Sequence, residues 1–142
     1  MVLDLDSVPL PFPEDSVDYV FCSHVLEHLK DWEKLVIDVH RMLKPNGIFE
    51  VRVPYGFQPR AYHRHYFGKQ SMELFIKNSS GDEISSNDPR AEFELAKWGF
   101  GRRTPFRWHL KKYTGIELSY TSSIGRRFEI FWLLRKPASR KS

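Results

Sequence analysis

The stretch from Asp18 to Val53, about 36 residues long, has the pattern of a strand, an amphipathic helix and a second strand. Asp18 to Cys22 is a continuous run of β-favouring residues, as expected for a strand that is buried on both faces. Apolar residues then recur at three- and four-residue steps from Val25 to Leu43, which places them on one face of a helix. Pro45 and the glycine two positions later predict that the helix ends near Lys44, before a second strand, Ile48 to Val53. This order predicts two parallel strands joined by a helical crossover.

The ends of these two strands are the first candidates for a functional site. In open sheets of parallel strands, ligands bind beyond the carboxyl ends of the strands. Ser23 to His28 follows the first strand, and Pro54 to Gly56 follows the second. We therefore expect the residues that carry function to lie in these two stretches.

The composition favours a single globular domain of 142 residues, with 41% hydrophobic and 15% aromatic residues. The net charge of +4 is a modest excess, consistent with ordinary solubility, so no nucleic-acid partner is expected. The lone Cys22 excludes an intrachain disulfide and fits a reducing compartment. The sequence has no apolar run of membrane-spanning length, and the N-terminus has acidic residues where a signal peptide has basic ones, so we expect a cytoplasmic protein without a membrane partner.

The remaining elements are expected from local patterns alone. Strands are predicted at 2–5, 93–100 and 127–135, helices at 69–78 and 104–113, and loops at 6–15, 55–67 and 79–89. A glycine-containing stretch from Gly99 to Thr104 allows either a phosphate-binding loop or a turn with exposed arginines, and the turn is favoured because position 104 is not glycine.

Four short motifs carry a resemblance to a known family. They are Asp6 with Leu10-Pro11-Phe12, then Ser16-Val17-Asp18-Tyr19-Val20, then Val25-Leu26-Glu27-His28-Leu29, and then Arg41-Met42-Leu43-Lys44-Pro45-Asn46-Gly47. Together they resemble the class I S-adenosylmethionine-dependent methyltransferases, in particular the group called methyltransferase type 11. The resemblance covers about residues 4 to 54 and, more weakly, Arg127 to Pro137. It implies an α/β fold, the C-terminal part of a Rossmann-like class I methyltransferase, with a mixed, mostly parallel sheet and helices on its faces.

The N-terminal part of the family pattern is missing from this sequence. The family begins with a strand, a G-x-G-x-G loop that approaches the cofactor, and a helix, and no glycine precedes Gly47 here. The resemblance therefore implies a chain truncated at its N-terminus. The strand Asp18 to Cys22 would lack a neighbour, and we expect Val2 to Leu5, a homodimer or another partner to cover the open edge.

The resemblance implies one partial domain, 1–142, that uses S-adenosylmethionine to methylate an unidentified acceptor. Its parts are a core at 1–56 with the residues of the cofactor rim, a variable acceptor-side region at 57–126, the last strand at 127–136 and a basic tail at 137–142. The alternative is a non-catalytic interaction subunit, or a remnant, that completes or regulates a full methyltransferase through the open strand edge.

The resemblance also assigns cofactor-binding residues. It implies that Asp6 accepts a hydrogen bond from the adenine amino group and that the Ser7 backbone N–H contacts the adenine ring. Ser23 and His24 would line the methionine end of the cofactor. The alternative for Asp6 is that it caps the proline-rich turn.

Three residues near the end of the first strand are candidates for catalysis. His24, Glu27 or His28 could remove the proton of a hydroxyl or amine acceptor. Many methyltransferases need only correct positioning of the two reactants. The alternative for Glu27 and His28 is that they brace the start of the helix.

The loop after the second strand is the candidate acceptor site. Tyr55, His63, Arg64 and His65 are the predicted substrate-binding residues, and the alternative is a solvated polar loop. Histidines 24, 28, 63 and 65 could in principle hold a metal ion. Because neither a cysteine cluster nor a fixed ligand spacing supports this, the sequence predicts no metal site.

Overall fold

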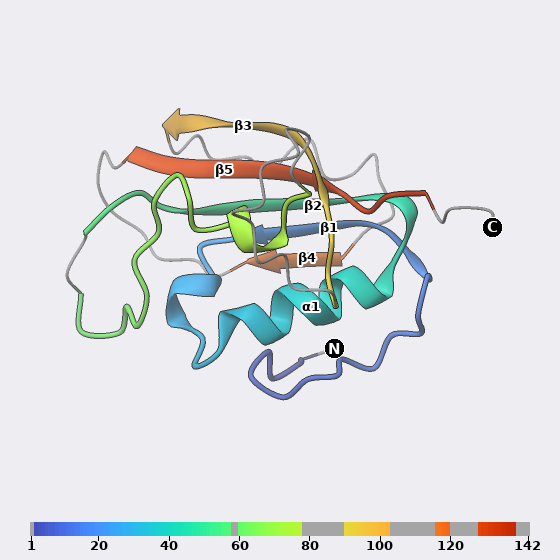
Figure 1. The fold of residues 1–142 in the computed structure, drawn as a ribbon. Helices are drawn as coiled ribbons and strands as arrows, with labels where there is room; N and C mark the ends of the chain where they lie inside the picture. Colours follow the sequence, from blue (N-terminus) through green and yellow to red (C-terminus); the bar gives the residue numbers. More distant parts are fainter. Residues whose placement is uncertain (1, 58–59, 78–89, 103–115, 120–127, 139–142) are drawn as a thin grey trace.

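The structure is a computed structural model that describes residues 2–57, 60–77, 90–102, 116–119 and 128–138 (Figure 1). Its centre is a five-stranded sheet in the order β3-β5-β2-β1-β4. The strands are β1 (Val17–Ser23), β2 (Leu43–Pro54), β3 (Glu94–Arg102), β4 (Ile116–Ser119) and β5 (Phe128–Arg135). The predicted mixed α/β sheet is confirmed. In the described part, the neighbouring strand pairs divide equally between parallel and antiparallel, whereas a mostly parallel sheet was predicted. β1 is parallel to β2 and β4, and β5 is antiparallel to β2 and β3.

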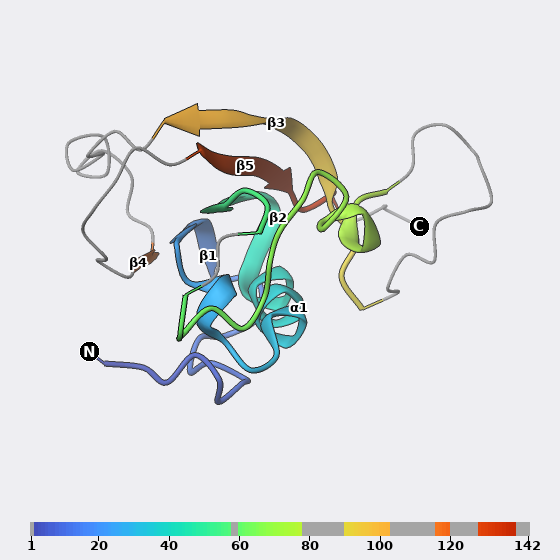
Figure 2. The ribbon, with the colours of Figure 1, turned by 90° about the vertical axis from the view of Figure 1, so that its left-hand side faces the viewer.

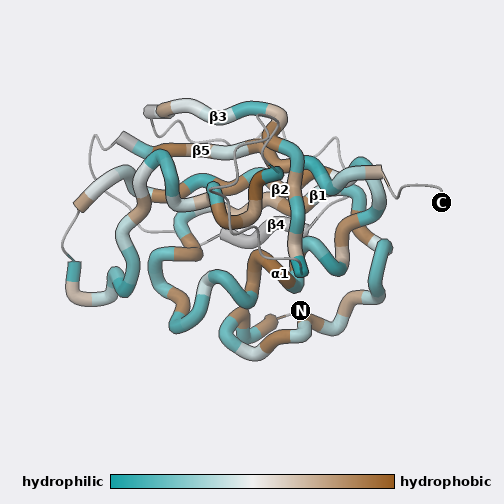
Figure 3. Tube along the Cα trace, in the orientation of Figure 1, coloured by the Kyte–Doolittle hydropathy of each residue, from teal (hydrophilic) through white to brown (hydrophobic). Residues whose placement is uncertain are grey.

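Helix α1 (Trp32–Met42) makes the crossover from β1 to β2 and lies on one side of the sheet (Figures 1 and 2). The predicted continuous helix is interrupted, because the 3₁₀ turn η1 (Leu26–His28) ends in extended backbone at Leu29 and Asp31 then caps α1 through the Lys34 N–H. Hydrophobic and hydrophilic stretches alternate along α1 (Figure 3), as expected for a helix with one buried face. No helix in the described part is long and apolar enough to span a membrane.

The two faces of β2 differ in chemistry. Phe49, Val51 and Val53 are fully buried in the core beneath α1. Because side chains alternate along a strand, Glu50 and Arg52 lie on the opposite face of the sheet. The face that α1 leaves uncovered therefore carries charged groups.

No neighbouring strand was predicted from the sequence for one edge of β1, but this edge is paired with another segment of the same chain. β4 runs parallel to β1, with Val20 opposite Ile116 and Ser23 opposite Ser119. The expectation that Val2 to Leu5 or a second copy covers this edge is wrong, because β4 already satisfies the hydrogen bonds there. Residues 2–5 form no strand and lead into a turn in which the Asp4 carboxylate accepts the Asp6 N–H at 3.0 Å.

Residues 69–77 contain less helix than predicted. Only Glu73–Phe75 (η2) is helical, although Met72 and Phe75 are buried as expected. Phe93 N–H donates to the Phe75 carbonyl and Lys77 N–H donates to the Phe93 carbonyl, each at 2.7 Å, so these groups form a bridge instead of a helix. The strands predicted at 93–100 and 127–135 are confirmed as β3 and β5, whereas the helix predicted at 104–113 and the loop at 79–89 lie outside the described residues.

Candidate functional site

The carboxyl ends of β1 and β2 lie side by side, as predicted, with Ser23 opposite Arg52. The next residue, His24, has a φ of +54°, a left-handed conformation in which histidine is enriched among non-glycine residues. Its backbone N–H donates to the Arg52 carbonyl at 2.8 Å. The chain thus turns sharply after β1, and this turn fixes the position of the His24 ring.

The His24 imidazole lies between two buried carboxylates. Its Nε2 is 3.1 Å from Oε2 of Glu129 on β5, and its Nδ1 is 3.5 Å from Oε1 of Glu27. Burial disfavours the charged ring, but the hydrogen bonds with Glu129 and Glu27 outweigh it and raise the pKa of His24 to about 9. At neutral pH this ring is therefore a positively charged hydrogen-bond donor, and a role as a base would require that it first lose a proton.

Arg52 extends the charged cluster across the sheet. Its Nη1 donates to Oε1 of Glu129 at 3.0 Å, and its Nε donates to Oε1 of Glu50 at 2.7 Å. The Tyr19 hydroxyl donates to the other Glu50 oxygen. Burial raises the pKa of Glu129, but the bonds from His24 and Arg52 outweigh this effect and hold it below its ordinary value. Opposite charges thus compensate each other along this face.

Two glycines of β3 make room for this cluster. A Cβ at Gly101 would lie 2.8 Å from Oε1 of Glu129, and a Cβ at Gly99 would lie 3.2 Å from the Phe131 ring. The turn predicted for residues 99–104 is not present at residues 99–102, because these residues continue strand β3. The glycines are required here by close packing against β5.

Glu27 is the most deeply buried member of the site. Its side chain is 2% exposed, and its Oε2 finds no hydrogen-bond partner among the described residues. Its backbone carbonyl accepts the N–H groups of Arg64, at 2.7 Å, and His65, at 3.3 Å. These bonds fasten the 60–67 loop to η1.

The predicted acceptor residues fall into different environments. His63 packs against the His28 ring, with centroids 5.1 Å apart. His65 donates its Nε2–H to the Leu29 carbonyl at 3.0 Å and braces the loop, while the Arg64 side chain is exposed. Tyr55 instead packs against Phe100 of β3, with ring centroids 4.8 Å apart. Of these four residues, His63 is the one that lies beside Glu27 and His28.

The predicted adenine-binding residues are held within the N-terminal segment. Asp6 accepts the Lys30 N–H at 2.8 Å, so it caps the segment that leads into α1 and not the proline-rich turn. Ser7 donates both its backbone N–H and its hydroxyl to Asp4, at 3.1 and 2.8 Å. Both residues are exposed, and their binding of adenine stays a prediction.

Sequence reasoning missed a buried pair that positions the proline-rich segment. Asp38, on the buried side of α1, accepts the Leu10 N–H and the Arg41 Nε–H, each at 2.7 Å. Arg41 also donates to the carbonyl of Phe12 at 2.8 Å. An acid in the apolar period of the helix was the signal that could have revealed Asp38.

Comparison with solved structures places this fold in a known class. The [4+2]-cyclase SpnF aligns over 98% of this chain and 56% of its own, with a TM-score of 0.60 and 15% sequence identity. At this identity the likeness concerns the fold alone, a Rossmann-like α/β fold. The activity has to be argued from other observations.

Sequence comparisons relate part of the chain to methyltransferases. Residues 1–51 match the family model described as a methyltransferase domain. A probable S-adenosylmethionine-dependent methyltransferase of Mycolicibacterium smegmatis is 44% identical over 45 residues, which are 32% of this chain and 18% of that protein. The demethylmenaquinone methyltransferase of Geobacillus stearothermophilus is 35% identical over 75 residues, 51% of this chain and 32% of that protein. Over these stretches the chain is similar to methyltransferases, and it spans less than a third of the length of either relative.

Proposed function

We propose that this chain is part of an S-adenosylmethionine-dependent methyltransferase whose transfer site lies at the carboxyl ends of β1 and β2. The observation that carries the proposal is a coincidence of position. The segment that matches the methyltransferase model, residues 1–51, contains the β1 end with Ser23, His24 and Glu27. Ligands of open α/β sheets bind at such ends.

The residues around this end suit a ligand that carries both a positive charge and hydrogen-bond donors. S-adenosylmethionine supplies a methyl group on a positively charged sulfur. The buried Glu27 carboxylate, whose Oε2 accepts no hydrogen bond from the described residues, would favour such a group. Ser23 and His24 would hold the methionine end, and the exposed Asp6 and Ser7 would hold the adenine.

Proton removal from the acceptor falls to Glu27 more readily than to His24. The raised pKa of His24 keeps its ring protonated at neutral pH, so it donates hydrogen bonds and positions its neighbours. Glu27 has a buried oxygen that accepts no hydrogen bond from the described residues. His28 and His63 flank this carboxylate, and Tyr55, Arg64 and His65 would shape the acceptor side of the site.

The non-catalytic alternative would need a surface other than the one predicted from the sequence. The predicted surface was a free edge of β1, but β4 occupies that edge. The buried Cys22 is consistent with a reducing compartment, and we place the reaction in the cytoplasm.

Calorimetric titration with S-adenosylhomocysteine tests the proposal. We expect Asp6→Asn and His24→Ala each to weaken binding by this chain at least about tenfold. Asp18→Asn is the matched control, since Asp18 lies near the start of β1 in an exposed pair with Lys44. Absence of binding, or equal binding by all variants, would contradict the proposed site.

A further inference from the structure

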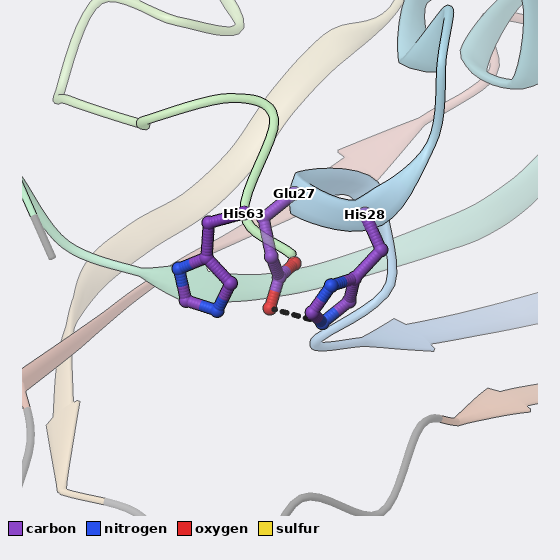
Figure 4. Close-up of side chains that lie close together, drawn as sticks. All are labelled: Glu27, His28 and His63. Carbon is purple, nitrogen blue, oxygen red and sulfur yellow. Dashed lines mark ion pairs between the residues drawn. The ribbon is translucent and has the colours of Figure 1, made fainter. Parts of the chain in front are cut away.

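We propose that Glu27, His28 and His63 form a binding site for a divalent transition-metal ion such as zinc. One ligand atom from each residue lies within 4.8 Å of the other two (Figure 4). Figure 4 shows the Glu27 carboxylate between the two imidazole rings. Two histidines and one carboxylate are a common ligand set for zinc and other first-row metals.

The distances are close to those of a loaded site. Ligand atoms about 2.1 Å from a tetrahedral ion lie roughly 3.4 Å from one another. Oε1 of Glu27 and Nε2 of His28 are 3.7 Å apart. A shift of His63 by about 1 Å, within the reach of a partly exposed side chain on a loop, would complete the triangle.

Hydrogen bonds prepare His28 for metal binding. Its Nδ1 lies 3.1 Å from the Tyr62 carbonyl oxygen, and because a carbonyl can only accept, Nδ1 carries the hydrogen. In the neutral ring the lone pair is then on Nε2, the atom that faces Glu27. A backbone carbonyl on the remote nitrogen is the usual outer partner of a metal-bound histidine.

Glu27 supplies an independent sign that a ligand belongs here. Its side chain is 2% exposed, and its Oε2 accepts no hydrogen bond from any described residue. A buried carboxylate oxygen without a partner is costly, and a bound cation would satisfy it. Oε1 lies 3.5 Å from His24 and 3.7 Å from His28, and an ion shared by both carboxylate oxygens would also satisfy Oε2.

The frame around the three residues is fixed before any ion binds. Arg64 N–H and His65 N–H donate to the Glu27 carbonyl, and the His65 ring donates to the Leu29 carbonyl. These bonds join segments that are more than 30 residues apart in sequence. His63 is thereby held beside η1, on the partly exposed side of the cluster, where an ion can enter.

Titration of the untagged protein with Zn²⁺ and with Co²⁺ tests this site. We expect one equivalent of Zn²⁺ to bind in calorimetry, and Co²⁺ to give the intense visible absorption of a four- or five-coordinate ion, with Mg²⁺ unable to displace either. His63→Ala and Glu27→Gln should each weaken Zn²⁺ binding by at least about tenfold, since even outer partners of a ligand have effects of this size.

His40→Ala is the control, because His40 lies on α1 and contacts the Glu92 carbonyl. Circular dichroism establishes that each variant is folded, and His63→Ala is expected to be so because its side chain is partly exposed. Zn²⁺ binding that is absent, or that His63→Ala and Glu27→Gln leave unchanged, would overturn the assignment. These measurements need no methyl donor, so they can fail or succeed separately from the cofactor titration. A metal-bound Glu27 could not also remove a proton, so Glu27 would serve as the base only in the metal-free protein.

Discussion

His24 and Glu129, 105 positions apart in sequence, form a hydrogen-bonded ion pair of 3.1 Å between the end of β1 and the start of β5. The pair exists because β2 lies between these two strands and is itself hydrogen-bonded to both. Arg52, on β2, donates to the same carboxylate. One buried acid therefore joins three strands at the place where we locate the transfer site.

Stability should fall as the pH rises above neutral. The pKa of His24 is raised from its ordinary 6.5 to about 9, so its contribution is complete below about pH 6.5 and is lost as the pH rises through 9. A shift of this size corresponds to on the order of 3 kcal/mol. Urea unfolding at a series of pH values, in EDTA to exclude metal ions, measures it. A free energy of unfolding that stays constant between pH 6.5 and 9 would disagree with this prediction.

Replacement of Glu129 by Gln should lower the pKa of His24 and destabilise the protein. The variant removes the negative charge that both His24 and Arg52 contact, and we expect a loss of about 2 kcal/mol at neutral pH. NMR titration of the His24 ring gives the pKa, and urea unfolding gives the stability. Glu94→Gln, which breaks an exposed pair with Arg135, should cost less than about 1 kcal/mol. Equal effects of the two variants would argue against a special role for the buried pair.

Asp38 should be essential for holding the proline-rich segment against α1. Asp38→Ala leaves the Leu10 N–H and the Arg41 guanidinium without their buried acceptor, and we expect a loss of about 3 to 5 kcal/mol. Asp18→Ala serves as the control, because Asp18 is 66% exposed and its pair with Lys44 should contribute about 1 kcal/mol or less. Urea unfolding of both variants measures the difference, and a loss for Asp38→Ala no larger than that of the control would contradict this account.

Local patterns were sufficient to predict the central crossover. The β-favouring run at β1 and the helical period of α1 each extend over a few residues, and each is recognisable in sequence. The predicted helix end near Lys44 is displaced, because α1 ends at Met42 and both Pro45 and Gly47 lie within β2. The Ser23 to His28 stretch was also singled out from the sequence, because it follows directly from the position of β1.

Contacts that depend on distant strands were not predictable in the same way. Arg52 and Glu129 are 77 positions apart, and only the antiparallel register of β2 with β5 places them within 3.0 Å. β4 is four residues long, and its pairing depends on the free edge of β1 and not on its own sequence. The position of His63 likewise depends on hydrogen bonds between its loop and Glu27, and no periodic pattern in the sequence indicates these bonds.

Hydrogen exchange provides a direct test of the β4 pairing. Along a parallel strand, successive N–H groups point alternately toward the two neighbouring strands. Since β1 pairs with β2 on one side and β4 on the other, we expect slow exchange at every amide from Val20 to Ser23. β3 is the internal control, because β5 is its one partner among the described strands, and alternate β3 amides should exchange fast. The same alternation along β1 would mean that β4 leaves this edge in solution, and pairing of β1 with another chain would again be possible.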